Sequence, residues 1–346
     1  MAEDEPRTAA TSAIEEARVT GRGERGRERE REREPKRGQE RERAMVPRAE
    51  FRSYYGRPIL KPPAWKEPDV PAYLFLGGVA GASAAMSAVA DLTGRPSPAR
   101  AGRCLAAGGA LVSVGALIHD LGRPERFLMM LRVFKPTSPL SVGSWILSPF
   151  SALATASALS ELTGRFPRLG RFAGLGSGLL GPAMCTYTAV LLADTAVPAW
   201  HEAYPELPFV FAGGALVSGA GAALLCVPHP DRGPLSRMGA LGAVMELAGM
   251  RRLERRLGLV GEPYRQDRPG RLLKTGRALT VAGVALSTLG PLFGRRAKAA
   301  SALAGAAYLA AGLCTRFGVF EAGVASARDP KYVVLPQRQR LESGGT

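Results

Sequence analysis

The chain has 346 residues, with 46 Lys and Arg against 30 Asp and Glu, which gives a formal net charge of +16. Residues 1–50 hold 13 basic and 13 acidic side chains, so the whole excess lies in residues 51–346, where short charged clusters separate long apolar stretches. This pattern argues against a soluble nucleic-acid-binding domain, whose charges would be spread over one face, and indicates a membrane protein whose loops carry the charge.

Cysteine and histidine usage restricts the redox metals that the chain can hold alone. The four cysteines lie in four different apolar stretches, and no two form a CxxC pair, so the grouped thiolates of an iron–sulfur cluster are missing. A membrane haem usually takes two facing histidines in the membrane core, but none of the three histidines (His119, His201 and His229) lies in the middle of an apolar stretch. The sequence therefore predicts no metal or haem in this chain.

The N-terminal segment is polar and of low complexity. Residues 21–34 read GRGERGRERERERE, which contains too few apolar side chains to offset the entropy of ordering, so residues 1–50 are predicted to be a disordered charged tail. A single charged helix is the alternative, which the glycines disfavour. The segment has no apolar core of a secretory signal, and Met45 leaves a later start codon open.

A proline-rich juxtamembrane segment covers residues 51–70. It is followed by eight apolar stretches, each near the roughly 20 residues that span a bilayer. They cover residues 71–90, 102–119, 141–160, 172–193, 207–227, 236–250, 273–293 and 299–324. Since backbone groups in lipid must satisfy their own hydrogen bonds, the stretches should be helices. The sequence predicts an all-α, polytopic membrane protein with an eight-transmembrane-helix bundle over 71–325 and a C-terminal tail at 326–346.

Glycine spacing and charge asymmetry add two further predictions. Gly77 with Gly81, and Gly174 with Gly178, are four residues apart and predict close helix packing.

An even number of spans places both ends of the bundle on one side, here called side A. Side A carries 20 Lys and Arg against 11 on the other side, which favours a cytoplasmic side A.

Polar residues near the span ends gather on side A. They are Tyr73, His119, Asp120, Tyr187, Asp194 and His201, with Glu246, Arg316 and Glu321 toward the same side. Ionisable groups in a membrane are costly and indicate a functional site, here a pocket or proton path that opens on side A. Glu246 is either a buried proton carrier or an ion-paired helix end near Arg251. Arg316 and Glu321 lie about one turn apart, where they can neutralise each other.

Three segments of the chain together resemble a known family. The most specific is HDLGRPERFLMMLRVFKPTSPLSVGSWIL at residues 119–147, and the other two are PAYLFLGGVAG at 71–81 and YTAVLLADTAVPAW at 187–200. Over about residues 54–325 the chain resembles the NrfD/PsrC family, the membrane subunits of polysulfide-reductase-type molybdopterin oxidoreductases. The first segment is specific and the other two are supportive.

The resemblance implies an eight-helix subunit with no redox centre of its own, which binds a quinone (menaquinone or ubiquinone) near one surface. The implied partners are a four-cluster ferredoxin-like iron–sulfur subunit and, beyond it, a molybdopterin catalytic subunit. The family pattern places the quinone at Tyr73 and Tyr187, and Tyr73 stands where some members have His. His119 completes the predicted quinone-binding set.

Quinone chemistry moves two protons with two electrons, so it needs hydrogen-bond donors and a relay to water. Asp120, Asp194 and Glu246 are the predicted proton-relay residues. Arg123, Glu125 and Arg126 are predicted to dock the partner, and their alternative role is to pair within the loop, where Pro124 opens a short interfacial helix. Membrane lipid is the remaining expected partner.

Other functions are compatible with parts of the sequence. A transporter would favour inverted repeats and charges at the midplane, which the sequence does not show. A structural anchor without quinone chemistry would use the same side A surface, and proton pumping would use the charged residues of the sixth and eighth spans. Trp65, Trp145 and Trp200 lie near the ends of apolar stretches and are predicted to be interfacial anchors.

Overall fold

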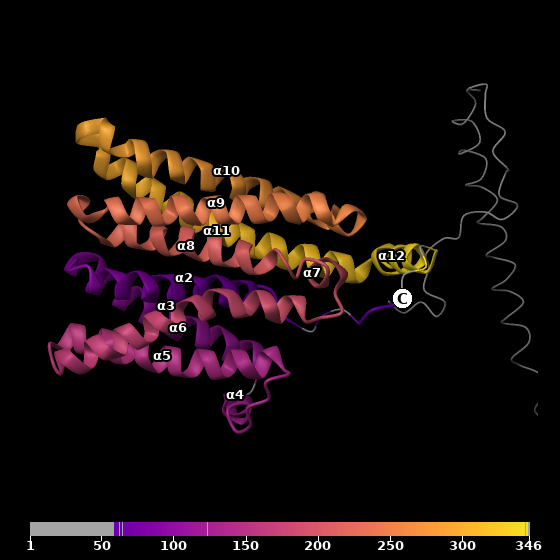
Figure 1. The fold of residues 1–346 in the computed structure, drawn as a ribbon, viewed down its shortest axis with the longest axis horizontal. Helices are drawn as coiled ribbons and strands as arrows, with labels where there is room; N and C mark the ends of the chain where they lie inside the picture. The colour runs from indigo at the N-terminus through magenta and orange to yellow at the C-terminus, as the bar shows by residue number, and fades with distance from the viewer. Residues whose placement is uncertain (1–58, 62, 64, 123, 343, 345–346) are drawn as a thin grey trace, which may run out of the picture. The chain divides into compact units, whose positions relative to one another are not determined.

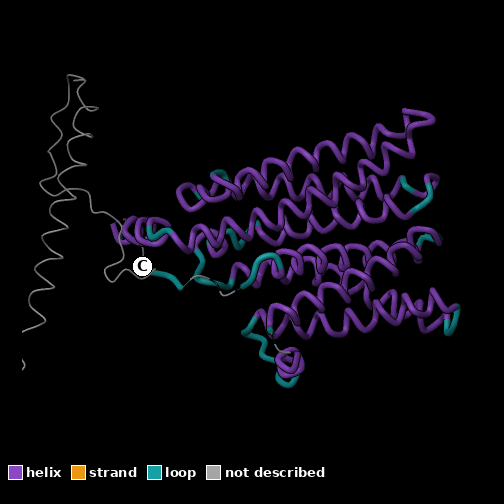
Figure 2. Tube along the Cα trace, turned by 180° about the vertical axis from the view of Figure 1, so that it is seen from behind, coloured by secondary structure: helices purple, strands orange, loops and turns teal. Residues whose placement is uncertain are grey.

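Eight long helices make up most of the part of the chain that the computed structural model describes, which is residues 59–61, 63, 65–122, 124–342 and 344. They are α2 (Asp69–Leu92), α3 (Pro96–Leu121), α5 (Pro139–Thr163), α6 (Pro167–Ala193), α8 (Leu207–Cys226), α9 (Gly233–Arg256), α10 (Asp267–Leu289) and α11 (Ala297–Arg328). These described residues contain no strand (Figure 2). The predicted disordered tail at 1–50 lies outside them.

Short elements connect the long helices. They are α4 (Pro124–Met130), α7 (Pro198–His201), η1 (His229–Asp231), η2 (Gly258–Tyr264), η3 (Gly290–Arg296) and α12 (Lys331–Glu342). Proline stands in the first turn of several helices, where its fixed φ suits the helix and no N–H is lost. Gly122 and Gly164 follow α3 and α5 at φ 71° and 67°, the left-handed conformation that ends a helix most easily with glycine.

The long helices form two groups of four consecutive helices. In the first, each of α2, α3, α5 and α6 packs against the next and α6 returns to α2; α8, α9, α10 and α11 repeat the same pairing. Helix α2 joins the groups, since it also contacts α8 and α11. Figure 1 shows α7 and α12 at one end of the long helices, while the α2–α3 and α8–α9 connections lie at the other. The end with α7 and α12 is side A.

Reciprocal glycine contacts bring the helices close together. A Cβ atom on Gly81 of α2 would lie 2.7 Å from the carbonyl oxygen of Gly181 on α6, and one on Gly242 of α9 would lie 2.7 Å from that of Gly213 on α8. Real side chains do not approach so closely, so only glycine permits this backbone separation. The predicted packing role of Gly77, Gly81, Gly174 and Gly178 is confirmed, because an added Cβ at each would contact a neighbouring helix.

Six of the eight predicted spans are confirmed as helices long and apolar enough to cross a membrane: α2, α3, α5, α6, α8 and α11. Helices α9 and α10 coincide with the sixth and seventh predicted spans, but they are not apolar enough to count as membrane spans. Their side A ends are rich in arginine, and α10 also has a lysine there. Both helices nevertheless run beside the apolar ones, α9 against α8 and α10 against α11 (Figure 1). The count of eight spans is therefore not confirmed by hydropathy.

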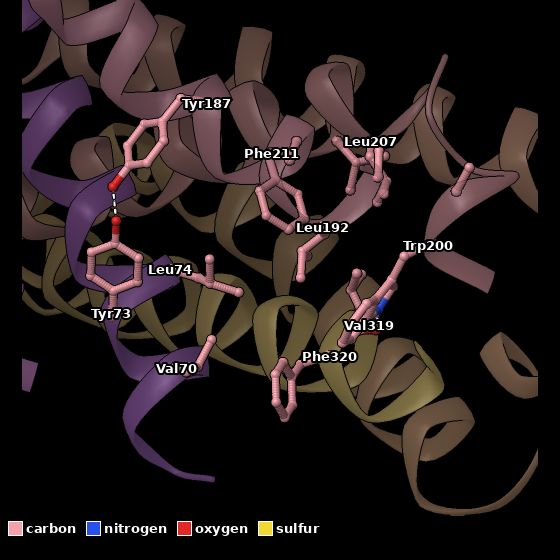
Figure 3. Close-up of a cluster of buried hydrophobic side chains, with 14 of the residues drawn as sticks. Val70, Tyr73, Leu74, Tyr187, Leu192, Trp200, Leu207, Phe211, Val319 and Phe320 are labelled. Carbon is pink, nitrogen blue, oxygen red and sulfur yellow. Dashed lines mark hydrogen bonds between the residues drawn. The ribbon is translucent and has the colours of Figure 1, made fainter. Parts of the chain in front are cut away.

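The prediction that Trp200 is an interfacial anchor is wrong. Its side chain is fully buried, stacks on Trp65 with ring centroids 5.6 Å apart, and donates from Nε1 to the carbonyl oxygen of Val319 at 2.8 Å. The Phe320 ring also packs against Trp200, with ring centroids 5.6 Å apart (Figure 3). Trp200 lies in the short helix α7, which α11 and η2 cover, so its position at the end of an apolar stretch does not expose it.

Replacing Gly242 by Ala should destabilise the protein, because the new methyl group would meet the backbone of α8. The expected loss is about 1–3 kcal/mol. The matched control is Gly108→Ala in α3, where an added Cβ meets nothing within 4 Å. There the lower entropy of alanine in the unfolded chain should stabilise the protein by about 0.5–1 kcal/mol. Thermal unfolding in detergent measures both, and a loss of similar size at the two positions would contradict the packing argument.

Candidate functional site

Two tyrosines from the first helix group meet in the interior. Tyr73 lies in the second turn of α2 and Tyr187 lies on α6, and their hydroxyl groups are hydrogen-bonded to each other. Both side chains are buried, with exposed fractions of 5% and 8% (Figure 3). The structure thus brings together two residues that are 114 positions apart and that the sequence predicts to share a site.

Neighbouring helices fix the position of this pair. A Cβ on Gly143 of α5 would lie 2.6 Å from Cε2 of Tyr187, so glycine is required for the ring to lie against α5. The Ser113 hydroxyl of α3 donates to the carbonyl oxygen of Tyr73 at 3.4 Å. The hydrogen bond between the tyrosines uses one hydroxyl proton, which leaves the other for a further acceptor. That donor suits the carbonyl oxygen of a quinone.

A carboxylate and an imidazole lie between the tyrosines and side A. Asp69 precedes Tyr73 by four residues, so it lies on the same face of α2 one turn nearer the surface. Its Oδ2 is 2.8 Å from Nδ1 of His119, whose side chain is largely exposed. Asp120 accepts a hydrogen bond from the backbone N–H of Lys66 at 3.1 Å. Asp69 is not among the predicted site residues, although its four-residue spacing from Tyr73 is a usable signal.

Asp194 lies in a separate cleft at side A, whose lining does not include the two tyrosines. It follows α6, seven residues after Tyr187, or about 10 Å along the helix. With His201 it lines a cleft of about 470 Å³ between α7 and α12. Lys331 of α12 donates to Glu262 of η2 at 3.0 Å, and this hydrogen bond raises the pKa of Lys331 above its ordinary value. That bond holds α12 beside the cleft.

The predicted docking residues lie on or next to α4. Glu125 and Arg126 are exposed, and Arg126 donates from Nη1 to the carbonyl oxygen of Leu121 at 3.1 Å. Arg123 lies outside the described residues. Leu128 and Met129 of the same short helix are also exposed, so α4 presents both charge and apolar surface. Its start at Pro124 agrees with the predicted short helix.

Glu246 lies in the second helix group and faces a buried arginine. The carboxylate of Glu246 and the guanidinium of Arg316 are both almost fully buried, and they converge on Gly214 of α8. A Cβ on Gly214 would lie 3.3 Å from Glu246 Oε1 and 3.8 Å from Arg316 Nη2. Glu246 makes no side-chain hydrogen bond with any described residue, whereas Arg316 donates from Nη2 to the carbonyl oxygen of Phe211 at 2.7 Å.

This arrangement decides between the earlier interpretations of the charges. Glu246 is not an ion-paired helix end near Arg251, because it is buried among α8, α9 and α11. The predicted neutralisation of Arg316 by Glu321 is wrong: Glu321 Oε1 pairs with Nη2 of Arg268 at 3.4 Å, while Arg316 lies over the Phe211 ring, 3.8 Å from its centroid. Glu246 is thus buried in the second helix group, whereas the Tyr73–Tyr187 pair lies in the first.

The part of the chain that the structure describes contains no group of three or more His, Cys, Asp or Glu side chains placed to hold a metal. Residues 64–233 match the model of the family described as polysulphide reductase, NrfD. The match covers just under half of the chain, from the residues before α2 to the start of α9. A comparison with curated proteins gives no match.

Glu246→Gln and Arg316→Met should each destabilise the protein, because each leaves one buried charge without its counter-charge. Losses of roughly 3–5 kcal/mol are typical for such changes. The double variant should lose less than the sum of the two, since neither charge remains. Chemical unfolding of all four proteins in detergent gives the coupling energy. Additive losses would show that the two side chains do not interact.

Proposed function

Since the chain belongs to the NrfD family over residues 64–233, a membership that implies a membrane subunit of a polysulfide-reductase-like oxidoreductase, we propose that it exchanges electrons and protons between membrane quinone and a partner iron–sulfur subunit. It anchors the complex and does not catalyse the overall reaction alone. The observation that carries the proposal is the buried Tyr73–Tyr187 hydroxyl pair, with the hydrogen-bonded Asp69 and His119 one helical turn nearer side A.

The two tyrosines would hold the quinone ring by one of its carbonyl oxygens. A bound quinone supplies two-electron chemistry that takes up or releases two protons. The free hydroxyl proton of the tyrosine pair donates to that oxygen, and burial of both rings keeps competing water away. Asp69 and His119 pass protons between the pair and water at side A, because the two side chains are hydrogen-bonded and His119 is largely exposed.

Three further residues are proposed as proton relays. Asp120 lies beside His119 at the side A end of α3, and Asp194 lines the cleft with His201. Glu246 is the buried member, and its carboxylate oxygens make no hydrogen bond with the described residues, as expected of a group that receives a proton or a water molecule. Asp120 and Asp194 would serve the quinone site directly, whereas Glu246 would serve a separate route through the second helix group.

We propose that all eight long helices span the membrane and that side A is cytoplasmic. On the outward face of α9, Leu241 and Val244 are exposed between Arg237 and Arg251. The two arginines are 14 residues apart, or about 21 Å along the helix. Their long side chains can reach toward opposite surfaces, so the distance between the two guanidinium groups approaches the thickness of a bilayer core. Exposed apolar residues framed by arginines suit a helix that faces lipid on one side.

The partner would dock at side A, near the site where electrons pass between the quinone and the partner. Helix α4 offers Glu125 and Arg126 with exposed Leu128 and Met129, a mixture of charge and apolar surface that is typical of a protein interface. The expected neighbour is a four-cluster ferredoxin-like subunit, which in turn binds a molybdopterin catalytic subunit. Arg123 belongs to the same proposed contact.

Tyr187→Phe should lower quinol oxidation at least tenfold, because it removes one hydroxyl of the pair. The matched control is Tyr308→Phe, a fully buried tyrosine of the second helix group that hydrogen-bonds to Ser287 at 3.0 Å. The measurement is turnover of a menaquinol analogue by the purified complex, with iron and molybdenum content determined on the same samples. Unchanged turnover in Tyr187→Phe with full metal content would contradict quinone chemistry at this pair and favour a purely structural anchor.

Arg126→Glu should weaken partner binding, since it reverses an exposed charge on α4 without changing a buried contact. We expect at least a threefold loss of co-purifying iron when tagged protein is isolated in mild detergent. Arg237→Glu, at the opposite end of the bundle, is the control and should retain its iron. Equal iron recovery in both variants would remove α4 from the docking surface.

A further inference from the structure

A groove on the outside of the second helix group gathers four arginines near side A. It lies between the end of α9 and the start of α10, with a volume of about 500 Å³. Its charged lining consists of Arg251, Arg255, Arg265, Arg277 and one carboxylate, Glu254. The groove is therefore strongly cationic.

The single carboxylate is already engaged. Glu254 Oε1 is 2.6 Å from Nη2 of Arg277, and the backbone carbonyl of Glu254 accepts a hydrogen bond from Arg265. No carboxylate among the described residues is paired with Arg251 or Arg255, and both are exposed. Two guanidinium groups thus remain available for an anion from outside the chain.

Helical geometry separates these two arginines from their sequence neighbours. Arg252 and Arg256 pair with the buried carboxylate of Glu206, at 3.4 Å and 2.7 Å. Arg251 and Arg255, one turn apart, face outward instead. The run RRLERR therefore serves two purposes: one pair fixes α9 to the start of α8, and the other pair lines the groove.

The inner wall of the groove is apolar. Leu247 and Val281 line it toward the membrane, and Val281 lies 14 residues into α10, about 21 Å from the helix start. Leu241 and Val244 continue this exposed apolar surface along α9. A ligand that fills the groove would be an amphiphile, with its negative charge at the side A end and its apolar part toward the membrane centre.

We propose that this groove binds the phosphate headgroup of an anionic phospholipid, with Arg251 and Arg255 as its main ligands and an acyl chain along Leu247 and Val281. Guanidinium groups suit phosphate because they donate two parallel hydrogen bonds. Basic pockets between membrane helices are typical sites for anionic headgroups. The proposal requires α9 and α10 to lie in the membrane and does not depend on quinone chemistry.

The test is the thermal unfolding of the full-length chain in detergent micelles, titrated with dioleoyl phosphatidylglycerol. Dioleoyl phosphatidylcholine and inorganic phosphate at the same concentrations are the parallel arms. Phosphatidylglycerol should raise the unfolding temperature of the wild type, since it binds only the folded protein. In the double variant Arg251→Gln with Arg255→Gln, its apparent affinity should fall roughly tenfold or more. Arg237→Gln removes a charge from the same face of α9 at the other end and should respond like the wild type.

Three results would overturn the proposal. Equal stabilisation by inorganic phosphate would indicate a small-anion site, and an unchanged phosphatidylglycerol response in the double variant would place lipid elsewhere. Loss of co-purifying iron in the double variant, with its lipid response intact, would make the groove a protein-docking surface. Without added lipid, each variant should unfold at the same temperature as the wild type, which verifies that the substitutions do not disturb the fold. Quinol turnover is measured separately, so failure here leaves the proposed function untouched.

Discussion

The fold depends on how closely backbones approach where glycine faces glycine across two helices. Hydrophobic burial does not drive helices together in lipid, so close packing has to supply the attraction. Helix α2 shows the effect most fully: Gly81 contacts α6, while Gly78 lies against Ala215 of α8 and the guanidinium of Arg316. One helix is thereby packed on both sides, and it also carries Asp69 and Tyr73. The candidate site is positioned by the same helix that joins the two groups.

The positions of the helices and several of their contacts were predictable, because they depend on patterns within short stretches of sequence. Apolar length located the helices, glycine spacing located their contacts, and family-like segments identified Tyr73 and Tyr187. Pairings between distant residues were not predictable in this way. Arg316 was assigned to Glu321 because they are neighbours in sequence, whereas its counter-charge Glu246 lies 70 residues away on α9. The prediction of Trp200 as an interfacial anchor fails for a related reason, since its position in the sequence does not reveal that other elements cover it.

The two helix groups share one pairing pattern but differ in chemistry. The first holds neutral hydroxyls near side A, and the family match covers all of it together with α8. The second holds a buried acid and base, and its α9 and α10 carry arginines at side A. The proposed electron transfer to a docked partner needs a site near one surface, and the tyrosine pair of the first group lies near side A. The charged interior of the second group is suited to proton movement or to stabilising the contact with α2.

The spacing of arginines on α9 also bears on the bilayer around the protein. About 21 Å of helix separates Arg237 from Arg251, which is less than the roughly 30 Å of an average hydrocarbon core. Extended arginine side chains cover part of the difference, and the remainder requires thinning of the adjacent lipid. On the proposal that α9 spans the membrane, its surface is matched to a thin bilayer. In a cell with regions of unequal thickness, hydrophobic mismatch at this one helix would favour the thinner regions.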